Sequence, residues 1–78
     1  MIVLTFFTHH SAMMTHRTLI SHSFNAKMAP VPRELSSSCG SCVEVYDVDE
    51  IDSSLCDEDI EGIYHFDGKK FTQLFSAE

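Results

Sequence analysis

Residues 2–7 form the first apolar run of the chain, and this run is continuous instead of alternating. A continuous run of β-branched and aromatic residues is typical of a strand that is covered on both faces. Thr8 is a favourable N-cap for a helix that we expect to extend to about Ser23. Residues at helical spacing on this segment predict one apolar stripe, made up of Ala12, Met13, His16, Leu19, Ile20 and the trailing Phe24. We therefore expect the chain to open with a buried strand and a helix that packs on it.

Three further strands are expected along the rest of the chain. Residues 26–31 predict a strand at the edge of a sheet, because Pro30 and Pro32 cannot donate a backbone hydrogen bond. Residues 42–48 alternate between apolar and polar positions and contain three valines, which is typical of a strand. Residues 60–66 predict a fourth strand on the same grounds.

A second, short helix is expected at residues 49–59, where Ile51 and Leu55 are one helical turn apart. With this helix the order of elements is β-α-β-β-α-β. That order matches a ferredoxin-like α+β sandwich of two layers, with one antiparallel sheet and both helices on one face. Asp67-Gly68 is a strong hairpin signal, so residues 71–75 are expected to add a short strand as a C-terminal extension.

Length and charge restrict the classes of protein to consider. The 78 residues predict one small domain, residues 1–78, and a homodimer would add buried area to a chain this short. The formal net charge is −7, and most of the acidic residues lie between Glu44 and Glu61. Such an acidic surface repels phosphate backbones and anionic lipids. We therefore expect neither nucleic acid nor membrane partners.

The apolar amino terminus also bears on the cellular compartment. It is too short to span a bilayer, and it lacks the positive segment and cleavage site of a secretory signal. We therefore expect a cytoplasmic protein, whose three cysteines meet a reducing environment. In that environment the C-x-x-C pair formed by Cys39 and Cys42 is more often redox-active or metal-binding than structural.

Residues 30–42 are the candidate functional site, with Cys39 as the reactive residue. The prolines of this stretch stiffen the backbone, and its serines and Gly40 allow a tight, exposed turn around Cys39. In the expected topology this loop lies beside the start of the first helix. The helix amides, the charge of Arg33 and the neighbouring Cys42 thiol would then favour the Cys39 thiolate. The residues expected to stabilise this thiolate are Thr8, His9, Ser38 and Gly40.

The run Pro-Val-Pro-Arg-Glu-Leu-Ser-Ser-Ser-Cys-Gly at residues 30–40 resembles the signature of a family of small bacterial proteins. That family is the putative selenium/sulfur carrier protein-like family, a domain of unknown function. Two further features agree with it: a strand leading into a helix that carries Thr8 and Ala12, and the closing Gly-Ile-Tyr at residues 62–64. The resemblance extends over about residues 2–66.

The resemblance implies a carrier, in which Cys39 accepts sulfur or selenium from a donor enzyme such as a cysteine desulfurase and passes it to an acceptor protein. The family's proline-arginine pair corresponds to Pro32 and Arg33. Cys42 and the tail of residues 67–78 lie outside the family pattern, and Thr15 or His16 stands where a glutamate is expected. We expect a carrier and not a turnover enzyme, because no general acid–base pair accompanies the thiol.

Two other functions stay open on the sequence. The chain could be a small protein-binding or regulatory module with incidental cysteines, or a dithiol redox protein that uses Cys39 and Cys42. Cys56, next to Leu55, is interpreted as a core residue. A closed metal site needs four ligands and usually a second paired element, which the sequence does not offer, so no metal and no cofactor are expected.

Overall fold

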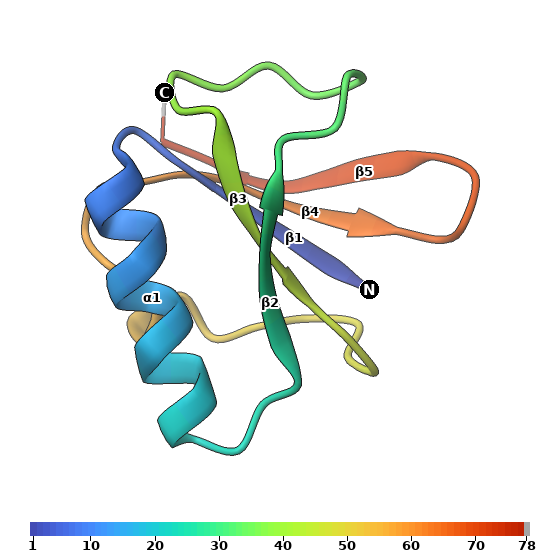
Figure 1. Ribbon diagram of the computed structural model, residues 1–78. Helices are drawn as coiled ribbons and strands as arrows, with labels where there is room; N and C mark the ends of the chain where they lie inside the picture. The colour runs from blue at the N-terminus through green and yellow to red at the C-terminus, as the bar shows by residue number, and fades with distance from the viewer. Residues whose placement is uncertain (78) are drawn as a thin grey trace.

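The computed structural model describes residues 1–77, which form a mixed α/β fold with one open antiparallel sheet (Figure 1). The elements in chain order are β1 (Ile2–Phe6), α1 (His9–Ser21), β2 (Ala26–Pro30), β3 (Ser41–Val45), the 3₁₀ turn η1 (Ser53–Leu55), β4 (Ile60–Phe66) and β5 (Phe71–Ser76). The strand order in the sheet is β2-β3-β1-β4-β5, and all four pairings are antiparallel. The prediction of a single antiparallel sheet is therefore confirmed.

The ferredoxin-like sandwich with two helices is not what the structure shows. Within residues 1–77 there is one α-helix, and the segment expected to form the second contains only the 3₁₀ turn η1. The Asp52 carboxylate caps this turn by accepting the Ser54 amide at 2.9 Å, but the turn ends at Leu55 and is not continued as an α-helix. The Asp57 amide is then held by the Thr15 hydroxyl at 2.8 Å. The sheet also has a fifth strand, β5, beside β4.

Helix α1 starts where the sequence predicts, but its buried stripe is different. The Thr8 hydroxyl caps the helix by accepting the Ser11 amide at 3.1 Å. The buried residues of α1 are Ser11, Ala12, Thr15 and Leu19. The prediction that Met13 and Ile20 belong to this stripe is wrong, because they are 45% and 48% exposed. With no second α-helix beside it, α1 is covered on one narrow face only.

Strand β1 runs through the centre of the sheet and is buried on both faces, as its continuous apolar run predicts. Alternate residues of a strand face opposite sides, and directly paired residues share a side. We call the side packed by α1 the helix face; it carries Ile2, Leu4, Phe6, Val43, Val45 and Ile63. We call the other side the loop face; it carries Val3, Thr5, Cys42, Gly62 and Tyr64.

The C-terminal hairpin forms as the sequence predicts. Gly68 has a φ of 98°, in the left-handed region that glycine occupies at little cost. The Asp67 carboxylate accepts hydrogen bonds from the amides of Lys69 and Lys70 at 2.8 and 2.9 Å. The resulting turn joins β4 to β5, so that β5 forms one edge of the sheet and the proline-ended β2 forms the other.

Candidate functional site

The loop of residues 31–40 connects β2 to β3 and runs along one end of the sheet, as Figure 1 shows at the top of the molecule. Its two ends are joined where the Val31 amide donates to the Gly40 carbonyl at 3.1 Å. A shorter turn inside the loop is closed by the Leu35 amide, which donates to the Pro32 carbonyl at 3.0 Å. The loop is therefore a folded surface segment with its own hydrogen bonds, and it carries Cys39 near its C-terminal end.

Cys39 is half-buried, and two short-range hydrogen bonds fix its position. Its sulfur accepts a hydrogen bond from the Ser41 amide, with a distance of 3.4 Å between nitrogen and sulfur. Its own amide donates to the Ser37 hydroxyl at 3.3 Å. These two contacts hold the Cys39 sulfur in a defined position at the C-terminal end of the loop.

The C-terminal end of this loop lies next to the start of α1. His9 Nδ1 is 3.0 Å from the Ser41 hydroxyl, and the Ser37 hydroxyl oxygen lies 3.3 Å from the Phe6 carbonyl oxygen. The structure thus brings His9 to the residue whose amide contacts the Cys39 sulfur. Thr8 is nearby in the chain, but its hydroxyl is engaged in capping α1. It acts on the site by starting the helix at this position.

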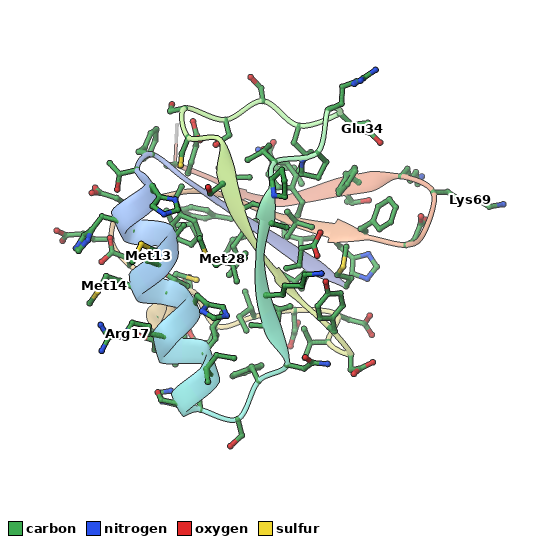
Figure 2. All side chains as sticks on the ribbon, viewed as in Figure 1. Met13, Met14, Arg17, Met28, Glu34 and Lys69 are labelled. Carbon is green, nitrogen blue, oxygen red and sulfur yellow. The ribbon has the colours of Figure 1, made fainter. Side chains whose placement is uncertain are left out.

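Arg33 makes no hydrogen bond to Cys39 within residues 1–77. It is exposed, and within residues 1–77 its guanidinium makes no hydrogen bond or ion pair. Its neighbour Glu34 lies at the end of the loop away from α1 (Figure 2). Glu34 and Leu35 line a cleft of about 350 Å³ together with the hairpin residues Tyr64, Lys69, Lys70, Phe71 and Gln73. The Arg33 end of the loop therefore belongs to the β4–β5 hairpin side of the molecule.

Gly40 and Ser38 lie on either side of Cys39. Gly40 is exposed, and a Cβ atom placed there would meet nothing within 4 Å. Ser38 does bind an anion with its amide, but the anion is a side chain of the protein itself. Its amide and hydroxyl both donate to the Glu61 carboxylate, at 3.0 Å each. The Ser37 hydroxyl donates to the same carboxylate at 2.8 Å.

Glu61 is the site residue that the sequence reasoning missed. It was grouped with the acidic surface, whereas its carboxylate accepts three hydrogen bonds from the two residues that precede Cys39. Partial burial by itself raises the pKa of Glu61, but the hydrogen bonds from the Ser38 amide and from the Ser37 and Ser38 hydroxyls outweigh it, so the pKa lies below its ordinary value. The available signal was the Glu-Gly pair inside a strand pattern, since glycine there indicates a bulge.

The other two thiols have a different environment. Cys42 is fully buried on the loop face, and its sulfur contacts the Pro30 carbonyl at 3.5 Å. Burial, together with the charges of Glu44 and Cys39, raises the pKa of Cys42 to about 11. Burial and the nearby Asp52 raise the pKa of Cys56 to about 11 as well, and Cys56 packs against the core, in line with its interpretation from the sequence. All three cysteines are free thiols.

Two broader features of the described residues bear on function. In residues 1–77 no three side chains of histidine, cysteine, aspartate or glutamate are grouped so that they could hold a metal ion. No helix in the same range has the length and apolar character needed to cross a membrane.

Comparisons with known proteins add a family assignment. Neither the curated proteins nor the solved structures contain a match to this chain. A family model described as "Putative Se/S carrier protein-like" matches residues 1–65. The match takes in β1, α1, the Cys39 loop and Glu61, and it ends before the hairpin turn and β5. Because it covers most of the 78 residues, the chain belongs to the putative Se/S carrier protein-like family.

Proposed function

We propose that this protein is a thiol-based carrier, in which Cys39 accepts sulfur or selenium and relays it. One observation carries the proposal: the Cys39 sulfur, on a surface loop, accepts the Ser41 amide at 3.4 Å. The family description supplies the class of cargo. The same geometry supports a carrier better than a turnover enzyme, since the hydrogen-bonded groups around Cys39 hold the sulfur and do not form an acid–base pair.

The transfer step is a thiol–disulfide type of exchange. The Cys39 thiolate, formed by loss of its proton to water, attacks the outer sulfur of a persulfide on the donor protein. A sulfur–sulfur bond forms between Cys39 and that outer sulfur, and the donor's own sulfur–sulfur bond breaks. The donor cysteine leaves as a thiolate. The hydrogen of the outer sulfur stays on that sulfur, which is now bonded to Cys39. The step consumes no oxidant, and its reverse on an acceptor thiol releases the cargo.

The other thiols are poor candidates for this step at neutral pH. Only the thiolate attacks, and a thiol with a pKa of about 11 is ionised in about one molecule in ten thousand at neutral pH. Cys42 is in addition completely buried. We therefore assign the carrier role to Cys39 alone, and leave to Cys42 a role in packing the loop face.

The partners in this proposal are a sulfur or selenium donor enzyme of the cysteine desulfurase class and an acceptor protein, in the cytoplasm. The acidic segment between Glu44 and Glu61 would dock a partner with a basic surface, because complementary charges speed encounter. Glu61 itself is excluded from that docking surface, since its carboxylate is engaged with Ser37 and Ser38.

Mass spectrometry after incubation with a cysteine desulfurase and cysteine tests the proposal. We expect a gain of one sulfur atom on Cys39, and no gain in Cys39→Ser. The matched control Cys56→Ser should load like the wild type, because the Cys56 thiol is held protonated. An active desulfurase that leaves Cys39 unlabelled would overturn the carrier function.

The same samples separate the dithiol alternative. A carrier needs only Cys39, so Cys42→Ala should still accept sulfur. A reversible Cys39–Cys42 disulfide under mild oxidant, combined with loss of activity in Cys42→Ala, would instead support a dithiol redox protein.

A further inference from the structure

Glu61 occupies a specific irregularity at the start of β4. In the pairing of β1 with β4, Thr5 lies opposite Gly62 while Phe6 lies opposite Ile60, so Glu61 is an extra residue without a partner on β1. This arrangement is a β-bulge, which turns a side chain away from the regular alternation of the strand. Bulges are enriched next to functional sites for that reason. The bulge is what lets the Glu61 side chain reach the loop of residues 31–40.

The backbone around the bulge is held from several sides. The Ala77 amide donates to the Glu61 carbonyl at 3.0 Å, which ties the chain after β5 to the same residue. A Cβ atom at Gly62 would lie 3.0 Å from the Tyr64 ring and 3.2 Å from the Thr5 hydroxyl, so there is no room for a larger residue without displacement. The position of the Glu61 backbone is therefore set by the sheet, and its carboxylate extends from there to the loop.

Hydrogen bonds connect this carboxylate, through Ser37, with the backbone of Cys39. Glu61 accepts the Ser37 hydroxyl and the Ser38 amide and hydroxyl, at 2.8 to 3.0 Å. The Ser37 oxygen in turn accepts the Cys39 amide at 3.3 Å. Two residues further on, the Ser41 amide donates to the Cys39 sulfur. The loop backbone is thus anchored to the sheet immediately before the cysteine and again at β3.

We propose that Glu61 is the positioning residue of the Cys39 loop: by binding Ser37 and Ser38 it holds the turn that places the Cys39 sulfur against the Ser41 amide. The expected effect of Glu61 on sulfur transfer rests on the carrier function proposed above. Its structural part, the ordering of residues 37–41, stands independently. Glu61 does not touch the transferred atom in this proposal, and it acts through the geometry of the loop.

Geometry and charge can be separated by two substitutions. Glu61→Ala removes all three acceptor contacts. Glu61→Gln keeps the size and shape and removes the charge, because the amide oxygen can still accept from Ser37 and the Ser38 amide while the amide nitrogen donates to the Ser38 hydroxyl. Glu50→Ala is the matched control, as Glu50 is exposed and has no hydrogen bond to the loop. Ser37→Ala removes one end of the contact and leaves β4 unchanged.

The first readout is amide hydrogen exchange at Ser38, Cys39 and Ser41, which needs no sulfur donor. In Glu61→Ala we expect exchange at these amides to accelerate about tenfold, the change that corresponds to one lost hydrogen bond. In Glu61→Gln the exchange rates should stay within about threefold of the wild-type rates, and in Glu50→Ala they should equal the wild-type rates. Should Glu61→Ala fail to fold, Ser37→Ala is expected to accelerate exchange at Ser38 and Ser41, whose amides do not bind Ser37 directly.

The second readout compares two reactions of Cys39. We expect Glu61→Ala to lower the rate of sulfur transfer from the desulfurase about tenfold while changing alkylation by iodoacetamide less than threefold, because only the protein donor requires a defined loop. Rescue by Glu61→Gln supports positioning over charge. Unchanged exchange at Cys39 and Ser41 in both Glu61→Ala and Ser37→Ala would overturn the inference. If the wild type itself takes up no sulfur, the carrier function is wrong. The hydrogen-exchange data still show whether Glu61 orders residues 37–41.

Discussion

On the helix face of the sheet, Leu4 and Val43 belong to one apolar cluster with Leu19 of α1. On the loop face, equally buried positions carry Thr5 and Cys42, and the neighbouring loop is fastened by hydrogen bonds to Glu61. The two sides of the same strands are therefore held by different interactions. Apolar burial contributes more free energy of folding and tolerates small shifts of side chains. Hydrogen bonds contribute less, but they fix the orientation of the groups that they join.

The difference separates stability from presentation of the thiol. A chain of 78 residues buries a limited core, so loss of apolar contacts on the helix face should unfold the whole domain. Loss of a hydrogen bond on the loop face should release the segment before Cys39 and leave the sheet intact. Each prediction below perturbs one face and asks whether the other responds.

The largest effect is expected from Leu4→Ala on the helix face. Leu4 is fully buried in the central strand, and such truncations cost about 2–5 kcal/mol through lost burial and the cavity left behind. Urea unfolding followed by circular dichroism should show this loss of stability, with exchange accelerating throughout the sheet.

Leu74→Ala is the matched control, because Leu74 is 50% exposed on β5 and should change the stability by less than about 0.5 kcal/mol. If Leu4→Ala accelerated exchange only in residues 37–41 and kept the global stability, the division between the two faces would be wrong.

A smaller effect is expected from Gly62→Ala on the loop face. The new methyl group would lie 3.0 Å from Cε1 of Tyr64 and 3.2 Å from the Thr5 hydroxyl, so the Tyr64 ring must move. Such overpacking typically costs about 1–3 kcal/mol, and here the displaced ring also lines the cleft next to Ser36 and Glu61. We expect a modest loss in urea stability together with faster exchange at Ser38.

Gly40→Ala serves as its control, since nothing lies within 4 Å of the new atom and Gly40 has no left-handed φ. That substitution should be neutral or should stabilise by about 0.5 kcal/mol through the unfolded state. Equal destabilisation by the two alanines would show that the crowding at Gly62 does not matter.

The sequence predicts the elements whose signals are local. The continuous run gives β1 its burial on both faces, Thr8 fixes the start of α1, and Asp67-Gly68 fixes the hairpin between β4 and β5. These features depend on neighbouring residues, on turn geometry or on one strand's own pattern. They therefore do not depend on how the rest of the chain packs.

Features that depend on what packs beside a segment were not predictable in the same way. Met13 and Ile20 have the spacing of core residues, yet they are exposed because the segment after β3 forms a 3₁₀ turn and not a second helix. For the site, the position of Cys39 beside the start of α1 follows from topology. The contact of Glu61 with Ser37 and Ser38 depends on a bulge in the pairing of β1 with β4, next to Thr5 and Gly62, which are 57 residues apart in the chain. The glycine is a local signal for a bulge, but it does not indicate which loop the Glu61 side chain reaches.

The smallest effect is expected in how the free energy of unfolding changes as the pH falls. The pKa of Glu61 lies below its ordinary value of 4.5, since the hydrogen bonds from Ser38 and Ser37 outweigh the effect of partial burial. A carboxyl group whose pKa is lower in the folded than in the unfolded state contributes its full stabilisation above the unfolded pKa, and this contribution is lost as pH falls through the folded pKa. The loop face should therefore loosen in acid before the helix face, whose cluster contains no titrating carboxylate.

Urea unfolding at about pH 6 and at about pH 3 measures this contribution. Glu61→Gln should lose less stability between the two pH values than the wild type, because the amide does not titrate. The exposed carboxylates Asp52 and Asp67, whose pKa values are also lowered by hydrogen bonds from nearby backbone amides, remain in every variant and cancel in the comparison. Glu50→Gln should keep the wild-type loss, since Glu50 has no hydrogen bond in residues 1–77 that its substitution would remove. Identical acid losses in Glu61→Gln and the wild type would mean that the carboxylate binds the loop no better when it is charged, and that its contacts with Ser37 and Ser38 position Cys39 by shape alone.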